Sequence, residues 1–277
     1  MTHPLFTIVI PTFNEEHFLG KLLESLERQS FRDFEVVVSD GGSKDKTVAV
    51  ARSYQKKLPH LSVLDPKTGE DSSPSRQRNQ GATSARGTWL LFIDADSVLL
   101  PYALERIAVF TTSGDVTQFT TWFLPDSDVG GDIVLTLLGI LLVESSILLK
   151  RSMAPGPLTG IARSAFTDVG GYNESIRFAE DYDITQRLER QGNALRILRE
   201  GLYIYSLRRA RKEGRLRFLQ IHAKASVYTL FTKKAYRQMP NYILGGHIYT
   251  KKPSKKKRFI LRKLEIYLKA LMKELGE

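Results

Sequence analysis

The chain has 277 residues, 42% of them hydrophobic and 26% charged, which is typical of a globular protein that buries a full core. Cysteine is absent, which excludes disulfides, thiolate metal sites and cysteine nucleophiles. The net charge of +11 is uneven: residues 206–277 carry 20 Lys/Arg and 4 Asp/Glu, whereas residues 1–205 carry 21 and 26. Such a basic end indicates contact with an anionic surface, either a membrane or a nucleic acid.

The N-terminal part alternates between apolar strands and helical patterns. Strands are predicted at 6–11, 34–39, 61–64 and 89–94, with helices ending near residue 30 and spanning 45–57 and 76–85. This alternation predicts an α/β fold built on a parallel, doubly wound sheet. Ligands of such sheets bind beyond the carboxyl ends of the strands, which is where Asp40, Asp94 and Asp96 fall.

The chain after residue 100 is predicted to add further strands and helices. Strands are expected at 116–123, 158–163, 195–198 and 202–205, and helices at 101–111 and 180–192. Residues 133–149 are the most apolar stretch, but their length and Glu144 make a poor membrane span. We therefore expect either a helix buried in the protein or one resting against a membrane face.

The basic end contains a charged segment, 251–258, followed by a predicted amphipathic helix over 257–275. A basic amphipathic helix can lie on an anionic bilayer, but it can also pack its apolar stripe on the body of the protein. The first residues show no secretory signal, so the expected location is the cytoplasm, with peripheral contact to the inner face of the cell membrane as an option.

Asp94 and Asp96 follow five large apolar residues, 89–93. Two nearby carboxylates at the end of a buried strand repel each other and resist desolvation, and a divalent cation such as Mg²⁺ or Mn²⁺ resolves that conflict. The alternative is that both are solvated loop residues that cap the next helix.

Five motifs then occur in one order along the chain. They are Pro11-Thr12-Phe13-Asn14-Glu15, Asp40-Gly41-Gly42-Ser43, Arg78-Asn79-Gln80-Gly81, Asp94-Ala95-Asp96 and Glu180-Asp181. With the turn at Gly170-Gly171-Tyr172, they make residues 5–210 resemble the inverting family 2 glycosyltransferases of the GT-A fold. The resemblance implies a mostly parallel, Rossmann-like sheet flanked by helices. It also implies a catalytic domain at 1–205, with a nucleotide half (1–97) and an acceptor half (98–205), and a basic helical extension at 206–277.

The resemblance implies roles for individual residues on the donor side. Those that would contact the nucleotide sugar are Pro11, Thr12, Glu15, Asp40, Arg76, Arg78, Asp94, Arg208 and Arg209. Asp40 would accept the imide N–H of the nucleobase, which uracil and guanine both offer; we expect UDP rather than GDP. Asp40 could instead form a turn, Glu15 could be a first-turn acid, and either helix arginine could be solvated.

On the same resemblance, Asp94 and Asp96 would bind Mn²⁺ or Mg²⁺, which clamps the diphosphate. Asp181 would be the catalytic base, with Glu180, Gly171 and Tyr172 on the acceptor side. Glu180 and Asp181 could also be helix-start acids. His222 is a further candidate ligand, although a lone helical histidine is usually structural.

These residues predict a metal-dependent inverting glycosyltransferase that moves a sugar from a nucleotide sugar, preferably a UDP-sugar, to a hydroxyl acceptor, with a membrane-associated lipid-linked glycan as one option. The lack of a Gln-x-x-Arg-Trp motif argues against a processive synthase. A polyprenyl-phosphate glycosyl synthase is the nearest alternative, because its anionic acceptor needs no base. A nucleic-acid-binding protein is the alternative from another class. It leaves the acids at the strand ends unexplained, so we expect no nucleic acid partner.

Overall fold

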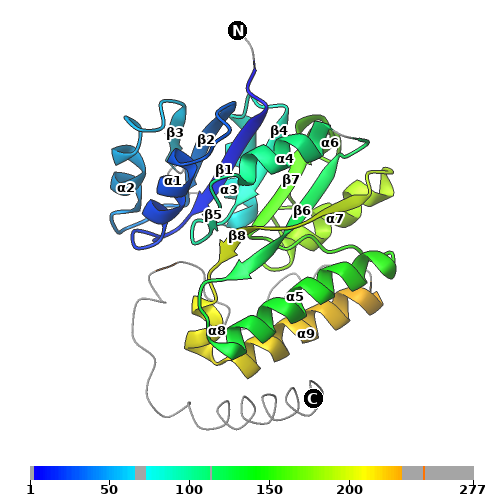
Figure 1. Ribbon diagram of the computed structural model, residues 1–277. Helices are drawn as coiled ribbons and strands as arrows, with labels where there is room; N and C mark the ends of the chain where they lie inside the picture. The colour runs from blue at the N-terminus through cyan, green and yellow to red at the C-terminus, as the bar shows by residue number, and fades with distance from the viewer. Residues whose placement is uncertain (1–2, 66–72, 113, 233–245, 247–277) are drawn as a thin grey trace.

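The computed structural model describes residues 3–65, 73–112, 114–232 and 246. Its centre is one eight-stranded sheet in the order β3-β2-β1-β4-β7-β6-β8-β5 (Figure 1). The strands are β1 (Phe6–Thr12), β2 (Phe34–Asp40), β3 (Leu61–Leu64), β4 (Trp89–Ile93), β5 (Val98–Leu99), β6 (Gln118–Pro125), β7 (Leu158–Ala162) and β8 (Leu195–Tyr205). The helices are α1 (Leu19–Glu27), α2 (Thr47–Ser53), α3 (Pro74–Thr83), α4 (Ala103–Thr112), α5 (Gly130–Leu148), α6 (Arg163–Asp168), α7 (Glu180–Arg190), α8 (Arg208–Glu213) and α9 (Arg215–Thr232).

Strands β3, β2, β1 and β4 pair in parallel, and β6 pairs in parallel with β8. Strand β7 runs antiparallel to both β4 and β6, and β5 runs antiparallel to β8. The predicted mostly parallel sheet flanked by helices is thereby confirmed. The carboxyl ends of β1, β2 and β4 lie at one edge, as the positions of the predicted acids require.

The central strands are apolar because both of their faces are covered. Phe6, Ile8 and Ile10 of β1 pack into a core cluster with the leucines of α1, while Val9 belongs to a second cluster on the other face with Phe92 of β4. Continuous burial along a strand is the pattern expected of a parallel sheet with helices on both faces. This packing fixes the strand ends that carry the polar residues.

Three elements differ from the sequence prediction. The strands expected at 195–198 and 202–205 are one strand, β8, whose pairing with β6 shifts register between Thr121 and Phe123. The shift passes over Arg199, Glu200 and Leu202, while Gly201 still pairs with Trp122, so the strand does not end. Neither β5 nor α6 was predicted, because stretches of two and six residues are too short to show a periodicity.

The apolar stretch at 133–149 does form a helix, α5, which lies beside α9 below the sheet (Figure 1). Its buried residues are Asp132, Thr136 and Ser146, so the first of the two expected settings, a helix buried in the protein, was wrong. The predicted helix at 257–275 lies outside the described residues.

Candidate active site

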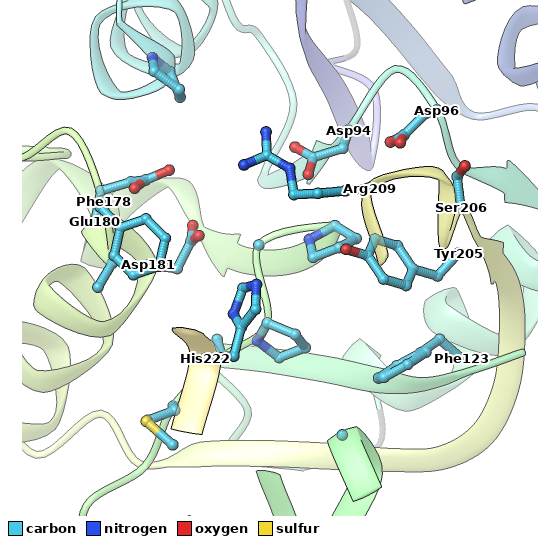
Figure 2. Close-up of a pocket in the computed structure, with 18 of the residues that line it drawn as sticks. Asp94, Asp96, Phe123, Phe178, Glu180, Asp181, Tyr205, Ser206, Arg209 and His222 are labelled. Carbon is cyan, nitrogen blue, oxygen red and sulfur yellow. The ribbon is translucent and has the colours of Figure 1, made fainter. Parts of the chain in front are cut away.

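A cavity of about 900 Å³ lies at the carboxyl ends of β1 and β4 and extends to α5 and α9. In Figure 2, Asp94 and Asp96 lie on one side of it, and Glu180 and Asp181 lie on the opposite side. Strand β4 ends immediately before Asp94, and helix α7 begins at Glu180. The sheet edge and the start of one helix therefore bring two pairs of carboxylates together.

Arg78 is the buried cation between these two pairs. Its Nη2 donates to Asp94 Oδ1 at 3.0 Å, and its Nη1 donates to Glu180 Oε1 at 2.6 Å and lies 3.4 Å from Asp181 Oδ1. The guanidinium also stacks over the ring of Tyr172, 5.3 Å from its centroid. Sequence reasoning assigned Arg78 to the nucleotide sugar; the structure places it as a link between the predicted metal side and the predicted base.

Asp181 is the second residue of α7, and the helix is preceded by Ala179, whose φ of 61° is a left-handed conformation. A Cβ added to Gly156 would lie 2.5 Å from Asp181 Oδ2, so any larger residue there would have to displace the carboxylate. Burial raises the pKa of Asp181 to about 7; the nearby Arg78 opposes that rise, and Glu180 adds to it. A carboxyl group with this pKa can exchange a proton near neutral pH.

Asp96 and Glu15 both contact a second arginine, Arg208, which is the first residue of α8. Both Nη atoms of Arg208 donate to the Glu15 carboxylate at 2.8 Å, and Nε lies 2.8 Å from Asp96 Oδ2. The guanidinium stacks on Phe18, 4.0 Å from the ring centroid. The segments that follow β1 and β4 and the start of α8 therefore meet in one buried cluster of charges. Figure 2 shows Arg209 in the same cavity, on the side of Asp94.

The two aspartates fit a hard divalent cation by their donor chemistry, since their carboxylates and that of Glu15 offer only oxygen ligands. Burial raises the pKa of Asp94 and that of Asp96 to about 6; the neighbouring arginines lower these pKa values. Additional positive charge, such as that of a bound cation, would offset the free-energy cost of burying the two ionised carboxylates. Among the described residues, no three His, Cys, Asp or Glu side chains are grouped closely enough to hold a metal by themselves. Asp94 and Asp96 would therefore hold a metal only together with ligands that the described side chains do not supply.

The Asp40 carboxylate organises a turn. Its Oδ1 accepts from Thr12 Oγ1 at 3.0 Å and from the Ser43 hydroxyl at 2.6 Å. Its Oδ2 accepts from the backbone N–H groups of Gly42 at 2.9 Å and Ser43 at 2.8 Å. Each carboxylate oxygen thus accepts two hydrogen bonds, so binding a nucleobase N–H would require one of these partners to leave. The nucleobase role of Asp40 stays a prediction.

Other predicted residues lie around the cavity rather than in its wall. Arg76 pairs with Glu174, with Nε 3.4 Å from Oε2, and is not a wall residue. Gly171 has a φ of 70°, and the N–H of the buried Tyr172 donates to Asn79 Oδ1 at 2.8 Å. This hydrogen bond positions Tyr172, whose ring packs against the guanidinium of Arg78.

The far half of the cavity is apolar. Helices α5 and α9 supply most of its wall, together with Phe123 and Phe178. The His222 ring packs on Phe218, with centroids 4.2 Å apart, and burial lowers the His222 pKa to about 4, so the ring is neutral at pH 7. This environment is that of a structural histidine.

Two glycines of the site were not anticipated from the sequence. Gly156 touches Asp181, as described above. The N–H of Gly246 donates to Phe13 O at 3.2 Å, and a Cβ on Gly246 would lie 2.3 Å from Glu15 Oε2. No local pattern marks either residue, because both contacts join segments far apart in the chain.

Comparison with known proteins places this geometry. Residues 7–168, more than half of the chain, match the model of a family described as "Glycosyl transferase family 2". The chain is 31% identical over 192 residues to a PGL/p-HBAD biosynthesis glycosyltransferase of Mycobacterium bovis, covering 68% of this chain and 70% of that protein. It is 28% identical to the poly(ribitol-phosphate) beta-N-acetylglucosaminyltransferase TarS of Staphylococcus aureus, covering 74% of this chain and 36% of TarS.

Solved structures show the same fold. A crystal structure of TarS residues 1–349 with UDP matches with a TM-score of 0.60 at 24% identity, and the match covers 73% of this chain and 60% of that one. The mannosyltransferase PcManGT from Pyrobaculum calidifontis, in complex with GDP-Man and Mn²⁺, matches with a TM-score of 0.64 at 19% identity, covering 84% and 64%. The predicted GT-A fold is confirmed.

Proposed function

Because the chain belongs to glycosyl transferase family 2 and is therefore a nucleotide-sugar glycosyltransferase, we propose that it transfers the sugar with inversion to a hydroxyl acceptor. The observation that carries the proposal is the buried Arg78, whose guanidinium contacts both Asp94 and Asp181. In this proposal, Asp94 at the sheet edge belongs to the donor side, and Asp181 at the start of α7 belongs to the acceptor side.

In the proposed reaction, Asp181 takes the proton of the acceptor hydroxyl while that oxygen attacks the anomeric carbon. The bond from this carbon to the diphosphate oxygen breaks as the new glycosidic bond forms, and attack from the opposite face inverts the centre. The raised pKa of Asp181 supports its role as base, since a carboxylate that titrates near neutral pH is a stronger base than an ordinary aspartate.

The donor side would be formed by Glu15, Asp40, Asp94, Arg208 and Arg209. Asp94 and Asp96 would hold a Mn²⁺ or Mg²⁺ ion, which when bound supplies positive charge to the departing diphosphate. Arg208 and Arg209 line the same cavity and would add positive charge on this side. We propose UDP as the nucleotide because TarS, a relative of this chain, has been crystallised with UDP and with UDP-GlcNAc; the GDP-Man complex of PcManGT makes GDP the competing choice.

The test is turnover of UDP- and GDP-linked sugars, with release of the free nucleotide as the readout, by the wild type and by Asp181→Asn. We expect one nucleotide class to be consumed, and the variant to lose about 10²- to 10⁴-fold in kcat while still binding the nucleotide. Asp183→Asn is the matched control, because Asp183 is in the same helical turn but pairs with Arg187 at 2.8 Å. Undiminished turnover by Asp181→Asn would contradict the hydroxyl acceptor and would favour an acceptor that is already anionic, such as a polyprenyl phosphate.

A further inference from the structure

Helix α5 has its polar and apolar residues in the reverse of the usual arrangement. Its buried residues are Asp132, Thr136 and Ser146, whereas Leu137, Leu141 and Leu148 are 55%, 59% and 84% exposed. A helix on the surface of a soluble protein normally buries its leucines and exposes its polar residues. Exposed apolar side chains gathered on one helix mark a surface that contacts something apolar.

The neighbouring surface continues this apolar region. On α9, which runs beside α5 in Figure 1, Leu216 and Leu219 are exposed as well. Beyond the C-terminal end of α5, the next residue, Leu149, is 61% exposed. Because α5 and α9 contact each other, we treat their exposed leucines as one surface, which we call the α5–α9 face.

Among the described helices, α5 alone is long and apolar enough to cross a membrane. Its polar contacts, however, attach it to the body at both ends. Asp132 pairs with Arg215 at 2.6 Å, and Glu144 pairs with Arg199 at 2.9 Å and accepts from Trp122 Nε1 at 2.9 Å. A helix fixed in this way lies along the surface of the protein, so its apolar side can rest in a bilayer interface while the other side stays on the protein.

Exposed positive charges lie on or next to the two helices of the α5–α9 face. Lys150 follows the end of α5, and Arg217 and Lys224 are exposed on α9. Residues 206–277 together carry 20 Lys/Arg against 4 Asp/Glu. Basic side chains beside an apolar helix face match the chemistry of an anionic lipid surface, which offers hydrocarbon and negative head groups together. This complementarity favours a bilayer over a purely apolar protein partner.

The same helices also form the wall of the active-site cavity. Leu138 and Leu142 line the cavity and are themselves exposed, as is Leu219 of α9. The apolar half of the cavity is therefore continuous with the α5–α9 face, and its polar half holds Asp181 and Asp94. A ligand in this cavity would place an apolar portion between α5 and α9 and a polar portion at the carboxylates.

We propose that the α5–α9 face docks on an anionic lipid bilayer, and that the acceptor is an amphiphile anchored in that bilayer, whose apolar part enters the cavity between α5 and α9. The statement about the acceptor rests on the proposed function, whereas the statement about docking does not. The hydroxyl group of the acceptor would then meet Asp181 from the membrane side.

The test of docking is flotation of the full chain with two kinds of vesicle, phosphatidylcholine alone and an equimolar mixture with phosphatidylglycerol. We expect the wild type to float with the mixed vesicles and Leu137→Glu/Leu141→Glu to lose about tenfold or more in partitioning, because two leucines leave the interface. Val109→Glu is the control, since Val109 of α4 is 56% exposed and lies outside this face; it should bind like the wild type. Equal flotation of the double variant and the wild type would overturn the proposal, as would absence of wild-type flotation.

Two further measurements separate this proposal from its alternatives. Sedimentation in lipid-free buffer tests whether the α5–α9 face binds a second copy of the chain. Bilayer docking is overturned if the wild type self-associates, the double variant does not, and both proteins float equally with the vesicles. Thermal stabilisation by UDP reports the nucleotide site and should be the same in the double variant and the wild type, so failure of the proposed function shows there and not in flotation. For the acceptor, transfer to alkyl glycosides should show KM falling with alkyl length; a KM independent of length would overturn the amphiphile.

Discussion

Asp181 gives the site a pH dependence whose sign follows from its pKa. Burial raises this pKa to about 7, and the protonated carboxyl group cannot accept a proton from the acceptor. We expect kcat to be level above about pH 7 and to fall about tenfold per pH unit below it. Rates measured at saturating substrates across this range test the expectation, and a flat profile would contradict it.

The raised pKa of Asp181 also makes the stability of the protein depend on pH, but stability falls with rising pH whereas kcat rises. Stability measurements therefore check this pKa independently of activity. Because the folded state binds this proton more tightly than an unfolded aspartate of pKa 3.8, its contribution to stability is present at low pH and is lost as pH rises through about 7. Asp181→Asn should therefore unfold at a higher temperature than the wild type near pH 8, and the difference should shrink toward acid pH. A lower melting temperature of the variant near pH 8 would show that the charged carboxylate is stabilised where it lies.

At the scale of single elements, the start of α8 holds the donor side together through Arg208. This guanidinium is mostly buried between Glu15 and Asp96, and removal of one partner from a buried ion pair leaves uncompensated charge. We expect Arg208→Met to lower the free energy of unfolding by about 3–5 kcal/mol at neutral pH. Urea denaturation measures this loss.

Arg217→Met is the matched control for Arg208, because Arg217 is exposed on α9, one helix further along the chain. Surface substitutions of this kind change stability by about 0.5 kcal/mol or less. An Arg208→Met effect as small as that of the control would mean that water or other groups already compensate the two carboxylates.

The elements show which parts of this fold are readable from the sequence. Strands β1, β2 and β4 are predictable because continuous apolar runs and the polar residues that end them are local signals. Helix α5 was predicted, but its environment was not, since an apolar helix gives the same pattern in a core and on a membrane face. The register shift that keeps β8 continuous depends on its partner β6, and no single-strand pattern reports it.

For the site, the motifs identified the acids but not their partners. Asp94, Asp96 and Asp181 line one cavity, and the sequence could anticipate their proximity because the first two follow a strand and the third lies in the first turn of a helix. The contact between Glu15 and Arg208 joins residues 193 positions apart, which only the folded chain reveals. The close approach of Gly156 to Asp181 is of the same kind.

At the scale of the whole molecule, the sheet edge, α7 and α8 bring acids from distant parts of the chain into one cavity. The donor side alone contains Glu15, Asp94 and Asp96, whose pKa values are raised by burial and, to a smaller extent, by repulsion among the three carboxylates. Arg78 and Arg208 offset that repulsion within the protein. A diphosphate adds further negative charge, so its binding should depend on a cation that arrives with it.

We therefore expect Mn²⁺ and UDP to stabilise the protein together more than either does alone. At a ligand concentration 100 times the dissociation constant, binding adds about 2.7 kcal/mol to the free energy of unfolding, and the melting temperature of a chain of this size rises by roughly 5–10 °C. Thermal unfolding with UDP, Mn²⁺, both, and both with excess EDTA measures the coupling. Asp96→Asn should remove the joint effect, because it takes away one of the two expected ligands. An equal shift by UDP with Mn²⁺ and with EDTA would mean that Arg78, Arg208 and Arg209 bind the diphosphate without a metal.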